Sequence, residues 1–169
     1  MKTSLVRVIY SIAFLASAQF AAATAIAAGY DDHDALAGVK ELKVAFDITA
    51  GEAKALLSRL NIIDETRRSL MQQGVRPHFV LSFRGPATKL IQTDQSKIKP
   101  EDRATAGRIL AKLEEMQKAP GIENLEQCAV AIREQETRAE DVVPAVKVVG
   151  NAWISLMAYQ SRGYAYIAP

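Results

Sequence analysis

The sequence predicts one three-layer α/β/α domain built on a mainly parallel five-stranded sheet. From residue 41 onward, short apolar segments alternate with segments in which apolar residues recur at helical spacing. Turn residues follow each apolar segment and lead into a helix or helical turn, an order that gives parallel strands joined by right-handed crossovers. No internal repeat or low-complexity tract interrupts this order, so we expect a single domain over residues 41–169.

The first strand and the first helix have the clearest patterns. Apolar and polar residues alternate over 42–48, which is typical of a strand with one buried face. Thr49 and Glu52 have the spacing of a capping box, and apolar residues then recur every three or four positions until Gly74. We expect a strand followed by a long helix.

The second strand is predicted over 78–83. Gly85 and Pro86 follow it and predict a tight turn and the start of a short helix, because proline suits the first turn of a helix. A polar loop over 93–99 comes next, and Pro100 then begins a helix that ends at Pro120.

The last third of the chain predicts three more strands. A strand over 122–127 leads into Cys128 and a helical turn, and Thr137 with Glu140 forms a second capping-box pattern before a short helix. The remaining expected elements are a strand over 146–149, a helix capped by Asn151 that carries Trp153, and a strand over 164–167.

Residues 1–27 have the pattern of a secretory signal peptide. Lys2 and Arg7 precede an apolar run of about a dozen residues, shorter than the roughly 20 that span a membrane. Small residues follow that run. We therefore expect a periplasmic or secreted protein without stable membrane insertion, with a flexible segment over 28–40 ahead of the domain.

The charge balance gives no support to nucleic-acid binding. The full chain has 21 basic and 19 acidic residues, and residues 1–27 contribute two of the basic ones and no acidic one. The remaining chain is therefore balanced, whereas nucleic-acid binding usually needs a basic face.

Cys128 is the only cysteine in the chain and the main candidate for chemistry. It follows a predicted strand and precedes a helical turn, and parallel sheets form their sites at the carboxyl ends of strands. A helix amino terminus stabilises a thiolate, whereas nearby Glu123 and Glu126 oppose one. Three interpretations remain open: a working thiol, a buried apolar residue, or a disulfide between two chains. No second cysteine provides a dithiol motif.

Other candidate residues are fewer and weaker. Arg84, Gly85 and Pro86 follow the second strand and could form the rim of an anionic-ligand site. His78 could serve as a base only if it met Cys128 in space, and Asp47 at the end of the first strand is more typical of a structural acid. No glycine-rich nucleotide motif or metal-ligand spacing occurs, so we expect neither a cofactor nor a metal.

Four segments carry a resemblance to a known family: KVAFDI, HFVLSFRGPATKL, ENLEQCAVAIRE and VGNAWISLMAYQSRGYAYI. Over about residues 40–169 the chain resembles the DsrE/DsrF-like (YchN-like) family. The resemblance implies an α/β/α fold with a parallel sheet and assembly as a homo-oligomer, a trimer or hexamer. It also implies that Cys128 carries sulfur as a persulfide, exchanged with a donor or acceptor protein.

Two functions follow as expectations. The first is an exported DsrE-like protein that handles sulfur through Cys128, in the manner of a sulfur carrier or sulfurtransferase, although the sequence holds no complete catalytic motif. The alternative is a non-enzymatic homo-oligomer that binds a small ligand or partner and keeps Cys128 as a buried structural residue. A phosphate- or dinucleotide-binding enzyme has only the sheet architecture in its favour.

Overall fold

The computed structural model describes residues 31–169, and His33–Pro169 form one compact unit. The predicted signal peptide, residues 1–27, lies outside the described residues. Within the predicted segment 28–40, the described part forms turns, and Leu36 and Val39 pack against the core. No helix in the described part of the chain is long and apolar enough to cross a membrane.

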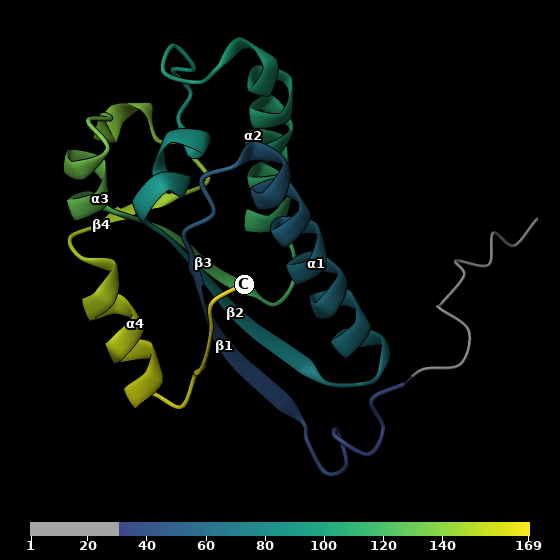
Figure 1. Ribbon diagram of the computed structural model, residues 1–169. Helices are drawn as coiled ribbons and strands as arrows, with labels where there is room; N and C mark the ends of the chain where they lie inside the picture. Colours follow the sequence, from purple (N-terminus) through teal and green to yellow (C-terminus); the bar gives the residue numbers. More distant parts are fainter. Residues whose placement is uncertain (1–30) are drawn as a thin grey trace, which may run out of the picture. The chain divides into compact units, whose positions relative to one another are not determined.

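The sheet has five strands, all paired in parallel, in the order β4-β3-β2-β1-β5. Their bounds are Glu41–Ile48 (β1), Arg76–Phe83 (β2), Ile122–Cys128 (β3), Lys147–Val149 (β4) and Ala165–Ile167 (β5). The register sets Ile48 beside Phe83 and Cys128 beside Val149, so the carboxyl ends of β1 to β4 meet at one edge (Figure 1). The expected α/β fold is confirmed.

Helices cover both faces of this sheet. Helices α1 (Ala53–Gln72) and α2 (Arg103–Gln117) pack on one face and α4 (Ala152–Ser161) on the other (Figure 1). The other elements are α3 (Ala129–Glu134) and the 3₁₀ helices η1 (Gly85–Ile91), η2 (Pro100–Asp102) and η3 (Ala139–Asp141), of which η2 and η3 are single turns. Because side chains alternate along a strand, the central strands β1 and β2 contribute to both layers.

The two layers between sheet and helices differ in size. The larger core lies under α1 and α2 and includes Phe79, whose ring meets that of Phe46 edge to face at 5.1 Å between centroids. The smaller core lies under α4 and joins Ala45, Val80, Leu156 and Tyr159. Because this core is small, hydrogen bonds near the two ends of α4 also help to attach the helix to the sheet.

Both predicted capping boxes are wrong. Helix α1 starts after Glu52, and neither it nor η3 has a side-chain cap. A Cβ at Gly51 would lie 2.4 Å from the Cβ of Pro86, so the chain crosses closely over η1 before α1 can begin. The hydroxyl of Thr137 donates to the Ile132 carbonyl at the end of α3 instead of capping, and only a single turn follows.

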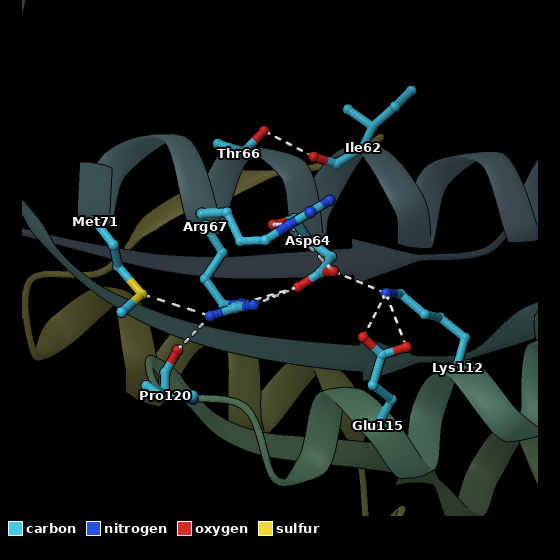
Figure 2. A network of polar contacts seen from close by, with 9 residues as sticks. Ile62, Asp64, Thr66, Arg67, Met71, Lys112, Glu115 and Pro120 are labelled. Atoms are coloured by element: carbon cyan, nitrogen blue, oxygen red, sulfur yellow. Dashed lines mark hydrogen bonds and ion pairs between the residues drawn. The ribbon is translucent and has the colours of Figure 1, made fainter. Parts of the chain in front are cut away.

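A buried ionic network joins α1 to α2 (Figure 2). Asp64 is 3% exposed; its Oδ1 accepts from Arg67 Nε at 2.9 Å and from Arg67 Nη2 at 2.8 Å, and its Oδ2 accepts from Lys112 Nζ at 2.7 Å. Arg67 Nη1 also donates to the carbonyl of Pro120 at 2.9 Å. Burial alone would raise the pKa of Asp64, but the hydrogen bonds from Lys112 and Arg67 lower it below its ordinary value.

Candidate functional site

Cys128 is the last residue of β3 and lies at the carboxyl edge of the sheet. Its side chain points to the α4 side, where the backbone N–H of Ala152 donates to Sγ with 3.3 Å between nitrogen and sulfur. Ala152 is the first residue of α4, a helix of ten residues, so the positive end of that helix faces the sulfur. The sequence placed Cys128 before α3; the amide that reaches its sulfur belongs to α4.

The capping of α4 fixes that amide. Asn151 precedes the helix in extended conformation, and its Oδ1 accepts from the backbone N–H of Trp153 at 2.9 Å. The predicted cap at Asn151 is thus confirmed. Because Asn151 satisfies the Trp153 amide, the Ala152 amide remains directed at Cys128.

A cavity of about 160 Å³ opens next to the sulfur. Its lining is more apolar than polar and consists of Arg84, Gly85, Cys128, Val130, Ala131, Glu134, Asn151 and Trp153. Cys128 is only 4% exposed, so its sulfur is reached through this cavity rather than from the open surface. This depth also disfavours a disulfide between two chains, because the two Cβ atoms of a disulfide must lie within about 4.5 Å of each other.

Arg84 is held at the cavity by a buried acid. Its Nε and Nη2 donate to Asp47 Oδ1 and Oδ2 at 2.7 and 2.6 Å, and Asp47 is 3% exposed at the end of β1. The hydroxyl of Tyr166 on β5 donates to the same carboxylate at 2.6 Å. The hydrogen bonds to Asp47 raise the pKa of Arg84 above its ordinary value, which keeps its positive charge fixed at the cavity.

Trp153 forms the wall beside Arg84. The guanidinium carbon of Arg84 lies 5.8 Å from the centroid of the Trp153 ring, near the outer limit of a cation–π contact. Trp153 is nevertheless 62% exposed, so its ring also belongs to the outer surface of α4. The cavity therefore borders the apolar outer face of that helix.

A second bond connects α4 to β3. The Tyr159 hydroxyl donates to Glu126 Oε1 at 2.7 Å and accepts from Asn124 Nδ2 at 3.0 Å. Burial, and then the hydrogen bond to Glu126, raise the pKa of Tyr159. Glu126 and Cys128 are two residues apart on β3, so their side chains lie on the same face of the sheet. Helix α4 contacts that face through Ala152 at its start and through Tyr159 near its end.

His78 does not pair with Cys128. It lies in the first half of β2, whereas Cys128 is beyond the other end of that strand, and its Nδ1 lies 2.7 Å from Glu123 Oε1. Tyr164 donates to the other oxygen of Glu123; burial first, and then this bond, raise the pKa of Tyr164 to about 12. The Cys-His arrangement considered from the sequence is therefore absent from this edge.

The three residues predicted to form the rim of a ligand site line two different pockets. Arg84 and Gly85 line the Cys128 cavity, whereas Pro86 lines a neighbouring open groove of about 540 Å³ together with Gly51 and three lysines. Within residues 31–169, no group of histidine, cysteine and acidic side chains could hold a metal ion.

Five of the eight cavity residues lay outside the predicted site: Val130, Ala131, Glu134, Asn151 and Trp153. Glu134 is the last residue of α3. It follows Ala131 by three residues, so the two side chains lie on the same face of the helix, and it follows Cys128 by six residues. That spacing in AVAIRE is a signal that could have found it. The sequence placed Trp153 on the last helix without a role in the site, and only the packing of α4 brings it to the cavity beside the thiol.

The fold and site together define a small parallel α/β protein with one thiol in a cavity at the carboxyl edge of its sheet. No protein-family model matches the chain. An uncharacterized protein from Aquifex aeolicus (strain VF5) is 26% identical over 126 residues, which are 75% of this chain and 55% of that protein. The chain thus spans about half the length of the curated relative that it matches.

A solved structure has the same fold. It is that of a protein of unknown function from Methanobacterium thermoautotrophicum, with a TM-score of 0.57 and 17% identity, covering 77% of this chain and 99% of that one. A likeness at this identity extends to the α/β fold alone.

Proposed function

We propose that the protein is an exported, DsrE-like sulfur carrier whose Cys128 thiolate accepts a sulfane sulfur. The observation that carries the proposal is the Ala152 amide, which donates to Sγ at 3.3 Å on the floor of a cavity. A backbone N–H and the positive end of a helix both favour negative charge on sulfur, and the thiolate is the nucleophilic form.

The transfer step needs no external oxidant. With a hydrodisulfide ion as donor, Sγ attacks the outer sulfur, and a new S–S bond forms to Cys128. The S–S bond of the donor breaks, and its electron pair leaves on the hydrosulfide ion. The product is a persulfide on Cys128, held beside the same amide.

The first test is the mass of the folded protein. Treatment with sodium hydrodisulfide is expected to add one sulfur atom per chain, which dithiothreitol then removes. The Cys128→Ser variant is expected to show no such adduct, since the chain has no other cysteine. The adduct is read by intact-protein mass spectrometry.

Accessibility of the thiol is the control for that test. Iodoacetamide is expected to alkylate Cys128 in the folded protein more slowly than in urea, because the sulfur is reached only through the cavity. A folded protein that forms no sulfur adduct and resists iodoacetamide, while the unfolded chain is alkylated, would rule the proposal out.

The alternative is a non-enzymatic binding protein with a structural cysteine, and the 4% exposure of Cys128 favours it. Buried cysteines are commonly inert. In that case the cavity holds a small ligand that does not react with the sulfur. A Cys128→Ser variant that keeps both assembly and cellular phenotype would favour this alternative over sulfur transfer.

We also propose that the chain forms a homo-oligomer, a trimer or hexamer by the family resemblance, through the outer face of α4. Trp153, Ile154 and Met157 are 61–62% exposed on this helix, and Ile167 of edge strand β5 is 45% exposed. Large apolar side chains gathered on one surface element are typical of a contact with another chain.

Light scattering coupled to size exclusion tests this contact. The wild-type protein is expected to elute as a trimer or hexamer, and the Ile154→Glu/Met157→Glu variant as a monomer, because two carboxylates would be buried without partners. The Arg108→Glu variant on α2 is the control with an added charge elsewhere. A wild-type protein that stays monomeric at every concentration would refute the contact.

Export through residues 1–27 is part of the proposal. The charged start, short apolar run and small residues of that segment support it. Protein recovered from the periplasm that still begins at Met1 would contradict it.

A further inference from the structure

The cavity beside Cys128 holds two opposite charges that are not paired with each other. Arg84 comes from the end of β2 and Glu134 from the end of α3, and both line the cavity without an ion pair between them in residues 31–169. Asp47 occupies Nε and Nη2 of Arg84, which leaves Nη1 without a described protein acceptor. The Glu134 carboxylate likewise has no described protein donor.

The size of the cavity limits what can enter. A volume of about 160 Å³ is below the roughly 300–1,000 Å³ of sites for drug-sized ligands. The ligand must therefore be small. Val130 and the Trp153 ring give it an apolar wall, with Sγ of Cys128 on the floor.

We propose that the sulfur donor for Cys128 is a small zwitterionic sulfur amino acid, of the cysteine persulfide type. Its carboxylate would bind at Arg84 Nη1, its ammonium group at Glu134, and its sulfur chain would face Sγ. An ion of one sign would gain from one of these side chains and be repelled by the other, whereas a zwitterion gains from both. This inference rests on the proposed sulfur-carrier function.

The step balances without any further reactant. The Cys128 thiolate attacks the outer sulfur of the amino-acid persulfide, and a bond forms between Sγ and that sulfur. The S–S bond of the donor breaks, its electron pair leaves on the amino-acid thiolate, and the proton of the persulfide moves with the transferred sulfur. Arg84 and Glu134 act only by orienting the donor for this attack.

Three matched disulfides test the recognition. L-Cystine carries both charged groups in each half, cystamine lacks the carboxylate, and 3,3′-dithiodipropionate lacks the ammonium group. For each disulfide we measure the rate of mixed-disulfide formation on Cys128. This rate is divided by the rate at which the same disulfide reacts with the free thiol N-acetylcysteine, which removes differences in intrinsic reactivity. L-Cystine is expected to exceed both analogues by about tenfold, the size of one charge-assisted hydrogen bond.

Two charge variants assign each contact. Arg84→Gln is expected to remove the advantage of L-cystine over cystamine, and Glu134→Gln its advantage over 3,3′-dithiodipropionate. Arg84→Gln leaves buried Asp47 without its cation, so its folding is checked by circular dichroism. Glu134 is exposed, and Glu134→Gln therefore tests the ammonium contact independently of folding. Glu136→Gln, outside the cavity, is the control and is expected to change neither ratio.

The outcomes separate this inference from the proposed function. The zwitterion assignment would be overturned if all three disulfides had equal normalised rates. It would also be overturned if Glu134→Gln left the rate ratio of L-cystine to 3,3′-dithiodipropionate unchanged. Either result would count even where hydrodisulfide still places sulfur on Cys128. A Cys128 that reacts with neither hydrodisulfide nor any of the disulfides would overturn the sulfur-carrier function itself.

Discussion

Replacing Asp64 by alanine is expected to lower the free energy of unfolding by about 3–5 kcal/mol. Asp64 is the shared acceptor of Arg67 and Lys112 between α1 and α2 (Figure 2). Its removal leaves two cations in a site where Arg67 is only 7% exposed, and an uncompensated buried charge costs far more than an ordinary surface contact. Urea unfolding followed by circular dichroism measures the change.

Glu115 provides the matched control. It also accepts from Lys112, at 3.2 Å, but its side chain is 66% exposed. Glu115→Gln is expected to change the free energy of unfolding by less than about 1 kcal/mol, because water screens an exposed pair. If the two variants lost equal stability, burial of Asp64 would not be the cause.

Replacing Gly121 by alanine is the second change expected to have a large effect. Gly121 has a φ of 86°, and a Cβ there would lie 2.6 Å from Pro77 Cγ and 3.0 Å from the Pro77 carbonyl oxygen. Gly121 cannot easily move away, because its own carbonyl accepts from the Phe79 amide at 2.8 Å at the start of the β2–β3 pairing. Both backbone strain and overlap therefore oppose the substitution.

Gly163 separates these two causes. It has the same φ of 86°, but a Cβ there would meet nothing within 4 Å. Gly163→Ala is expected to cost about 1–2 kcal/mol from the left-handed backbone alone. Gly121→Ala is expected to cost about 1–3 kcal/mol more, because Pro77 must be displaced. Equal losses in urea unfolding would show that the overlap with Pro77 is relieved without cost.

The sequence predicted the elements because their periodicities are strong. The alternation over 42–48 and the apolar spacing up to Gly74 reflect burial on one face, which is a local property of the chain. The capping boxes failed because a cap depends on how the chain enters the helix. Two residues after Thr49, that path is constrained by the close approach of Gly51 to Pro86, more than thirty residues away.

The site was predictable only in part for a similar reason. A parallel sheet brings strand ends together, so Cys128 and Arg84 could be expected at one edge before the structure was known. The order of the strands in the sheet could not be predicted in this way. Tyr166 reaches Asp47, 119 residues away in the chain, only because β5 pairs with β1. Neither that pairing nor the approach of the α4 amide to Sγ leaves a local pattern.

Helix α4 connects the thiol to the outer surface of the protein. The helix meets β3 through Tyr159 and through its first amide, and the same ten residues present Ile154 and Met157 outward. A neighbouring chain that shifted α4 by a fraction of an ångström would change the distance between Ala152 N and Cys128 Sγ. The chemical reactivity of the buried sulfur can therefore serve as a reporter of whether the far side of the helix is occupied.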